Sequence, residues 1–350
     1  MEVKALKFGG LTAKRPIVQG GMGVGVSLSS LAGNVAKCGG IGTISGVHPG
    51  YREADFKENP FRANLRAIGN ELEKAKEIAN GGIIGFNFMT VMNHYEEYVK
   101  EAIAAGADFI VSGAGLPVNL AKYAAGTRAA ILPIVSSARA LKLIVKQWQR
   151  ANRLPDAVVV EGPLAGGHLG YPYGHLVDGT FDTLEDSLVD VVDYVRELEE
   201  KNGVIIPVIA GGCVRSHADM ERLMALGASG VQVGTKFVAT EECDAAPAFK
   251  QAYLRSRKED VQLIESPVGL AARAIRNSFL EKVEKQGRIP VQRCYQCMNH
   301  CKQAETKYCI SQALIDAVQG REGLVFCGAN AYEIEKLSTV EKVMQELCGE

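Results

Sequence analysis

Short apolar runs alternate with longer amphipathic segments along most of this chain. The apolar runs are rich in Val, Ile, Ala and Gly, and they lack a polar face, which predicts strands buried on both sides as in a parallel sheet. The longer segments repeat apolar residues at the spacing of a helix with one buried face. We predict strands at 16–19, 40–44, 83–89, 109–112, 130–135, 157–160, 204–210 and 230–235.

Predicted helices separate these strands. They fall at 29–37, 60–80, 95–105, 138–151, 183–201 and 216–226, with a short helix after Pro117 and another beginning near Pro247. Repeated strand-then-helix units predict the α/β class and a (β/α)8 TIM barrel, which commonly takes about 250 residues. A doubly wound open sheet is the alternative, but no GxGxxG opens a helix with an acidic residue about twenty positions later. We therefore expect a barrel domain over 1–290 and a small helical extension over 291–350.

Composition narrows the class of protein. The chain has 350 residues, 47% hydrophobic and 23% charged, which is enough for a sizeable core. The net charge is −1, so the chain lacks the excess of basic residues that is typical of proteins that bind nucleic acid or an anionic membrane surface.

Residues 1–14 lack the apolar centre of a signal peptide and no run is long enough to span a bilayer, so we expect a cytoplasmic protein. We expect a small-molecule substrate, with a homodimer and a redox partner protein as open possibilities.

Glycine and small polar residues gather where the predicted strands end. The carboxyl ends of barrel strands form one face, where the active site of a TIM barrel lies. A barrel packed for stability alone would not need this pattern, whereas a ligand lying across that face would. The residues concerned are 20–23, Asn87, Ser136, 161–168, 211–212 and 234–235.

The loop after the sixth strand carries the main candidate for catalysis. The buried run 157–160 ends at Glu161, and a glycine-rich loop leads to His168. Glycine allows backbone to approach a ligand closely, and an imidazole that titrates near neutral pH can act as a general base. A solvated loop histidine is the alternative interpretation. The glycines after strands seven and eight lie where barrels bind a phosphate group, unless they only form tight turns.

Taken together, these segments resemble the nitronate monooxygenase family (formerly 2-nitropropane dioxygenases), which includes the flavin-type enoyl-acyl-carrier-protein reductases. The resemblance covers about residues 10–282, and any one motif alone would be weak. It rests on PIVQGGM at 16–22, GFN at 85–87, EGPLAGGHLG at 161–170, PVIAGG at 207–212, VQVGTKF at 231–237, and SP and RAIRN at 266–277.

The resemblance implies an FMN cofactor in the mouth of the barrel. It implies flavin-ring contacts from Gly21 and Met22, polar contacts from Asn87 and Ser136, and Glu161 near the ribityl chain. It also implies cofactor contacts from Gly23, Gly166 and Gly167, and a phosphate site built from Gly211, Gly212, Gly234 and Thr235. His168 matches the catalytic histidine of the family.

Two reactions follow from this resemblance. The first is oxidation of alkyl nitronates through the flavin, with His168 as catalytic base. The alternative is reduction of an enoyl thioester or another activated alkene, with electrons from NAD(P)H or from an iron–sulfur cluster. A third alternative is an iron–sulfur or flavin redox sensor that works through a partner without turnover, but it would leave His168 unexplained.

Two segments depart from what we expect of the family. Residues 142–154, which include Trp148, make a longer and more polar connection between strands five and six. Residues 171–175 carry Tyr171 and Tyr173 just after the catalytic loop. These rings could line a substrate pocket or cover the barrel rim, and we favour the pocket because binding sites recruit aromatic side chains. We expect His175 to be an exposed loop histidine.

The cysteines are unevenly distributed. Of nine cysteines, Cys294, Cys297, Cys301 and Cys309 form a Cx2Cx3Cx7C pattern, which in a reducing compartment indicates a metal site rather than disulfides. Zinc sites usually contain two CxxC pairs, so we favour a [4Fe–4S] cluster and keep zinc as the alternative. The pattern resembles the iron–sulfur segment of the 2,4-dienoyl-CoA reductase and trimethylamine dehydrogenase group.

The remaining tail adds three expectations. Cys327 could replace Cys309 as the fourth ligand, and His300 would lie outside the ligand set. Residues 310–350 predict two helices around an apolar turn, with 338–341 capping the second.

Overall fold

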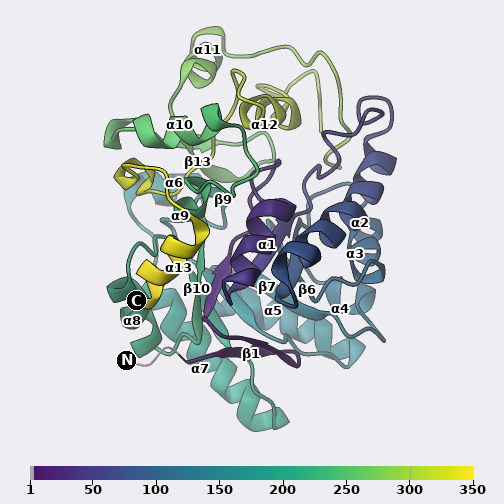
Figure 1. Ribbon diagram of the computed structural model, residues 1–350, viewed down its shortest axis with the longest axis vertical. Helices are drawn as coiled ribbons and strands as arrows, with labels where there is room; N and C mark the ends of the chain where they lie inside the picture. The colour runs from purple at the N-terminus through teal and green to yellow at the C-terminus, as the bar shows by residue number, and fades with distance from the viewer. Residues whose placement is uncertain (1–3, 300) are drawn as a thin grey trace.

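Eight parallel strands form a closed barrel in the computed structural model, which describes residues 4–299 and 301–350 (Figure 1). Each strand pairs with the next around the ring, and the last pairs with the first, which confirms the (β/α)8 prediction and rules out the open sheet. The barrel strands are β3 (Ile17–Gln19), β4 (Ile41–Ser45), β5 (Ile83–Met89), β6 (Phe109–Gly113), β7 (Ala130–Val135), β8 (Val158–Glu161), β10 (Val208–Gly211) and β11 (Gly230–Val233). The seventh begins at Val208 rather than at 204, since Ile205 is exposed to solvent.

Helices surround the barrel and cover its strands (Figure 1). Side-chain caps define several helix starts, among them a capping box between Thr183 and Asp186 at α7. None of the helices in the described part of the chain is both long and apolar enough to cross a membrane. They are α1 (Ser29–Lys37), α2 (Pro60–Ala79), α3 (Tyr95–Ala104), α4 (Leu120–Tyr123), α5 (Ala138–Trp148), α7 (Leu184–Asn202), α8 (His217–Ala225), α9 (Thr235–Val238) and α10 (Pro247–Arg255).

A hairpin closes the amino-terminal end of the barrel. Strands β1 (Leu6–Phe8) and β2 (Leu11–Ala13) pair with each other, and the Phe8 ring meets Phe109 edge to face at 6.0 Å. Leu6 and Phe8 belong to an apolar cluster with Val159 and Ile209 of the barrel strands. The hairpin therefore covers this end of the barrel.

An antiparallel sheet of three strands lies across that carboxyl end. It joins β12 (Val261–Glu265), β13 (Ala271–Ile275) and β9 (Gly167–Leu169). In its register Ala272 lies opposite His168 and Arg273 opposite Gly167. The catalytic loop predicted from sequence is therefore held as an edge strand of a sheet.

The segment between strands five and six is fixed to the core by its tryptophan. Trp148 is fully buried at the end of α5, and its indole N–H donates to the Pro117 carbonyl at 2.9 Å. Residues 171–175 lead into a short helix, α6 (Tyr173–Asp178). Trp148 therefore anchors α5 in the core.

The tail wraps back over the barrel. The two tail helices form as predicted, α12 (Ile310–Val318) and α13 (Val340–Cys348), after α11 (Ser278–Gln286). Thr339 caps α13 by accepting from the Lys342 amide, and α13 packs against α1 and α8 with Cys348 buried. Between the two helices, Phe326 forms a bridge to Ala274 of the covering sheet.

Candidate active site

Two cavities meet at the carboxyl end of the barrel. The first has a volume of about 350 Å³ and lies over the ends of β3, β5, β10 and β11. The second, of about 1190 Å³, opens between α5, the loop 170–173 and the tail segment 298–307. Both are lined by Ala114, Ile134, Glu161 and His168. A ligand in either cavity therefore reaches His168 and Glu161.

Several positions on the wall of the first cavity accept only glycine. A Cβ atom on Gly21 would lie 2.3 Å from Asn87 Cβ, and one on Gly23 would lie 2.6 Å from Ser45 Oγ. Gly212 has a φ of +110°, which residues with a side chain rarely adopt. These backbone amides can approach a flat ring or a phosphate group as closely as main chain allows. The wall fits the flavin nucleotide expected from the sequence.

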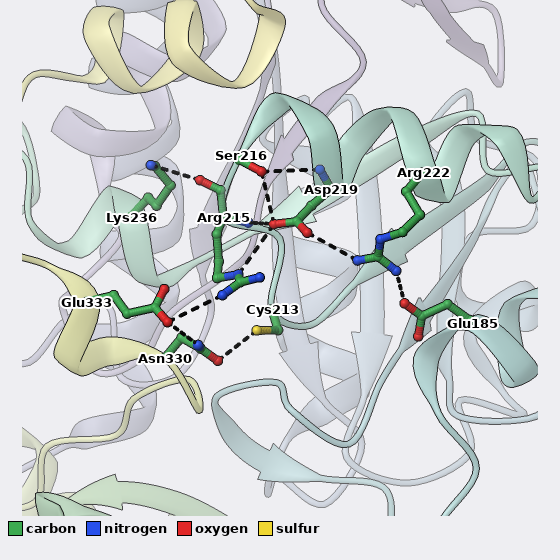
Figure 2. A network of polar contacts seen from close by, with 9 residues as sticks. All are labelled: Glu185, Cys213, Arg215, Ser216, Asp219, Arg222, Lys236, Asn330 and Glu333. Atoms are coloured by element: carbon green, nitrogen blue, oxygen red, sulfur yellow. Dashed lines mark hydrogen bonds and ion pairs between the residues drawn. The ribbon is translucent and has the colours of Figure 1, made fainter. Parts of the chain in front are cut away.

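A polar network fixes the end of the first cavity near β10 (Figure 2). The Cys213 thiol donates to Asn330 Oδ1 at 2.8 Å, and Asn330 Nδ2 donates to Glu333 at 2.6 Å. Arg215 forms an ion pair with the same Glu333 at 3.3 Å. Because these residues also line the cavity, the tail segment 328–334 is part of its wall.

A buried arginine supports the catalytic loop. Arg273 on β13 is 7% exposed, and its guanidinium donates to the carbonyls of Ala165 and Pro163, the latter at 3.0 Å. Burial lowers the pKa of this guanidinium, with Cys327 and Cys213 acting in the opposite direction. Arg273 therefore holds the glycine-rich loop through two main-chain acceptors.

His168 is oriented by a serine from the loop that follows β12 of the covering sheet. Its Nε2 lies 2.8 Å from Ser266 Oγ, and the Val268 amide donates to the same oxygen at 3.4 Å. The imidazole also meets the Phe326 ring edge to face at 4.9 Å. Burial lowers the pKa of His168 to about 4, so the ring is neutral at pH 7 and can accept a proton.

Glu161 lines the same cavities, and its side chain carries a proton at pH 7 where His168 has lost one. Burial raises its pKa to about 8, so the carboxyl group is mostly protonated at pH 7 and can donate a hydrogen bond. The Tyr171 hydroxyl donates to the Glu161 carbonyl at 3.2 Å. Both side chains are enclosed by protein yet touch the cavities, so a ligand that displaces water would strengthen both shifts. The site thus presents a neutral base and a neutral acid.

Aromatic and charged side chains shape the second cavity. Tyr171 and Tyr173 line it, which agrees with the pocket interpretation of these rings. Arg139, Lys302 and Lys307 also line it, while His175 is exposed outside it. Glu265 and Glu305 line it too, and they form ion pairs with Lys307 at 3.3 Å and with Lys302 at 3.2 Å. The cavity therefore combines apolar and aromatic walls with a mixed set of charges, which suits a ligand with both apolar and polar parts.

Most of the predicted site residues converge on the first cavity. These are Gly21, Met22, Gly23, Asn87, Glu161, Gly166, Gly167, His168, Gly212, Gly234 and Thr235. Ser136 instead lines the second cavity and donates to the Gly170 carbonyl at 3.1 Å. Gly211 is buried within β10, so its neighbour Gly212 contributes the exposed backbone.

Sequence reasoning did not assign a role to several residues of the site. Ser266 and Arg273 stood in matched motifs, while Cys213 and Asn330 gave no signal. Each acts through a partner distant in sequence, and only the fold brings such partners together. Arg273 lies in the otherwise apolar sequence AARAI at 271–275, and a charged residue at such a position was the one available indication of a role.

The predicted metal site is not preformed. In residues 4–299 and 301–350, no group of three or more His, Cys, Asp or Glu is arranged to hold a metal ion. Cys327 is buried and lines the first cavity. Burial raises the pKa of the Cys297 thiol to about 11. His300 lies outside the described residues.

Comparison with known proteins places this chain among flavin enzymes. The model of the family described as nitronate monooxygenase matches residues 4–350. A probable nitronate monooxygenase of Staphylococcus saprophyticus is 24% identical over 308 residues, which cover 81% of this chain and 82% of that protein. A probable nitronate monooxygenase of Staphylococcus aureus strain Newman is 25% identical over 305 residues, 80% of this chain and 81% of that protein.

Two solved structures share the fold. FabK from Thermotoga maritima has a TM-score of 0.71 at 23% identity, covering 96% of this chain and 92% of that chain. Nitroalkane oxidase from Streptomyces ansochromogenes has a TM-score of 0.67 at 19% identity, covering 96% of this chain and 95% of that chain. At these identities the likeness supports the barrel and not a particular substrate.

Proposed function

This chain belongs to the nitronate monooxygenase family and is an FMN-dependent oxidoreductase, and we propose that it oxidises alkyl nitronates with His168 as the catalytic base. The observation that carries this proposal is the position of His168, which lines both cavities. A base at that junction reaches a substrate in the second cavity and a cofactor in the first.

The first cavity is the proposed FMN site. Gly21, Met22 and Gly23 would contact the flavin ring, Asn87 its polar edge, and Glu161 the neighbourhood of the ribityl chain. Gly166 and Gly167 would border the cofactor, and Gly212, Gly234 and Thr235 would receive the phosphate. When bound, FMN supplies the electron-accepting chemistry that these side chains lack.

His168 would then hold or move the proton. Its neutral ring at pH 7 follows from burial, and Ser266 fixes one ring nitrogen. The ring can accept a proton at the nitrogen that faces the substrate, or donate from it if the other tautomer is present. Glu161, protonated at neutral pH, would add a hydrogen-bond donor in the same space.

The size of the second cavity favours a second candidate, the reduction of an enoyl thioester or another activated alkene. A volume of about 1190 Å³ exceeds the range of about 300–1,000 Å³ typical of sites for drug-sized ligands. A small alkyl nitronate would fill little of it, whereas an acyl chain on a long carrier would fill more. In that reaction NADH, NADPH or a cluster would supply the electrons.

An anaerobic absorbance experiment separates the two reactions. Propyl nitronate added to the oxidised holoenzyme should bleach the flavin bands if it is the electron donor. Flavin that stays oxidised, but bleaches on later addition of NADH or NADPH, would overturn the nitronate proposal in favour of the reductase.

Replacing the base provides the second test. His168→Ala should keep FMN bound while lowering the rate of flavin bleaching by about 100-fold or more, the usual scale of general-base loss. The matched control is His175→Ala, since His175 is an exposed histidine of the same region. An unchanged rate in His168→Ala would remove His168 from the mechanism.

Four further proposals concern the whole protein. Residues 1–290 would form the barrel unit and 291–350 the extension. The extension would carry a [4Fe–4S] cluster, with zinc as the alternative, and a redox partner protein would supply electrons to such a cluster. A homodimer is testable by sedimentation of the holoenzyme.

A further inference from the structure

One cation of the second cavity has no partner in the described part of the chain. The other two cations on its described wall are paired, Lys307 with Glu265 at 3.3 Å and Lys302 with Glu305 at 3.2 Å. Arg139 lines the same cavity, but its side chain forms neither an ion pair nor a hydrogen bond with any described residue. Because the two pairs cancel in charge, the charge of Arg139 is left without a counter-ion.

Arg139 lies in the first turn of α5, where a cation is unfavourable. Ser137 caps this helix by accepting from the Ala140 amide at 3.3 Å, and the first turn holds no acidic residue. The N-terminus of a helix carries a partial positive charge, so anions stabilise it and cations do not. The helix start and the guanidinium group therefore both favour an anion supplied from outside the chain.

Apolar side chains continue the face of α5 that carries Arg139. Leu143 is four residues further along the helix, so the two side chains lie on the same face. Leu143 is 49% exposed and lines the second cavity, as do Leu116 at 42% and Tyr173 at 37%. Large apolar side chains exposed around one cavity are typical of a binding surface. An aliphatic chain lying along them would remove this surface from water.

The two cavities separate Arg139 from the reacting groups. His168 lines both cavities, whereas Arg139 lines only the second. Glu161, the remaining acidic residue on this wall, is mostly protonated at pH 7 because burial raises its pKa to about 8, so it supplies no counter-ion for Arg139. A ligand that reacts beside His168 would therefore meet Arg139 with a different part of its structure.

We propose that the second cavity selects a substrate in which an aliphatic chain carries a terminal anionic group, and that Arg139 and Leu143 are specificity-determining residues for it. Arg139 would bind the anion and Leu143 the chain. A carboxylate and a phosphate both accept two parallel hydrogen bonds from a guanidinium group, so the anion is one of these two. The inference rests on the proposed function, because it takes the second cavity as the substrate site.

Binding of unreactive analogues to the oxidised holoenzyme tests this selectivity. Octanoate, octyl phosphate, octanamide and butyrate are titrated by calorimetry, which measures binding without turnover. At least one of the two octyl anions should bind about tenfold or more tightly than the neutral octanamide, the scale of a hydrogen bond to a charged group. The tighter anion identifies the group that Arg139 recognises. Octanoate should also bind at least about tenfold more tightly than butyrate, since four more methylene groups leave water.

Two results of the titrations would overturn the proposal. One is equal affinity for octanamide and both octyl anions, which would mean that no charge is recognised. The other is a lack of binding by both anions to holoenzyme with full flavin content.

Variants on α5 assign the contacts. Arg139→Gln should weaken binding of the tighter anion by about tenfold or more and leave octanamide unchanged, and Arg139→Lys should restore part of the loss. Leu143→Ser should weaken binding of octanoate but not of butyrate. The matched control is Arg150→Gln, since Arg150 is exposed just after α5 and lines neither cavity. Wild-type affinity in Arg139→Gln would refute the role of Arg139.

Flavin reduction separates this inference from the proposed reaction. With the nitronate of 6-nitrohexanoate, Arg139→Gln should raise the concentration that gives half the limiting rate by about tenfold and leave the limiting rate unchanged, because the contact is present before and during reaction. Propyl nitronate, which lacks a distal anion, should react equally with both proteins. If the analogues bind through Arg139 but neither nitronate bleaches the flavin, the proposed reaction fails and the specificity stands. If both nitronates react identically in wild type and variant, the specificity fails and the reaction stands.

Discussion

The burial of His168 predicts an unusual pH dependence for the flavin half-reaction. The base is active when the imidazole is neutral, so the rate should rise with pH through its pKa. Burial lowers that pKa to about 4, whereas an unperturbed histidine titrates near 6.5. At pH 5 a group with a pKa of 4 is about 90% neutral, and an unperturbed histidine is only about 3% neutral. The neutral fraction of the base at pH 5 is thus about thirty times that of an unperturbed histidine, so the rate should still be close to its plateau at pH 5.

Stopped-flow reduction of the holoenzyme by propyl nitronate between pH 4.5 and 7.5 measures this profile. The protonation of the nitronate itself is followed in the same buffers and divided out, and circular dichroism confirms that the protein stays folded. His168→Gln is the control, because it should be slow at every pH. A midpoint near 6.5 in the wild type, or the same profile and rate in His168→Gln, would refute the assignment of a buried neutral base.

Four other predictions rest on single contacts. Because the pKa of Glu161 rises from 4.5 toward about 8 on folding, the stability of the flavin-free protein should fall as pH rises between these values and level off above them. Glu161→Gln should remove that slope in denaturant titrations, and an unchanged slope would show that Glu161 is not its source. Arg273→Met should release the loop at Ala165 and weaken FMN binding by at least about tenfold, measured by flavin fluorescence, with the exposed Arg150 replaced in the same way as control. Gly212→Ala, at a φ of +110°, should reduce FMN retention and lower the melting temperature, an effect that normal flavin content would contradict. Gly69→Ala lies in α2 with no atom within 4 Å of the added methyl group, so it should stabilise the protein by about 0.5–1 kcal/mol without changing flavin content.

The barrel strands were predictable because most of their residues are apolar and buried, and because they alternate with helical segments. The strands β1, β2 and β9 have three residues each, and unlike the equally short β3 (Ile17–Gln19) they lie outside that strand-then-helix alternation. The covering sheet escaped prediction for a second reason. Its strands pair residues such as His168 and Ala272, far apart in the chain, and no local pattern reports that pairing.

The part of the site that could be predicted is the part where main-chain atoms, and not side chains, would contact the ligand. Glycines at strand ends indicate close ligand approach whatever their exact register, so most of them line the first cavity. Ser136 shows the limit, since the direction of a side chain at the end of a strand decides which cavity it lines. Ser266, which contacts His168, comes from a loop 98 positions away, and only the fold identifies it.

The tail segment that completes the first cavity has a consequence for biosynthesis. Phe326, Cys327 and Asn330 line that cavity, and they leave the ribosome after all eight barrel strands have emerged. A nascent chain can therefore close its barrel before it has a complete binding site for the nucleotide. Flavin should load only after the tail has docked, so cofactor content reports whether the tail is in place.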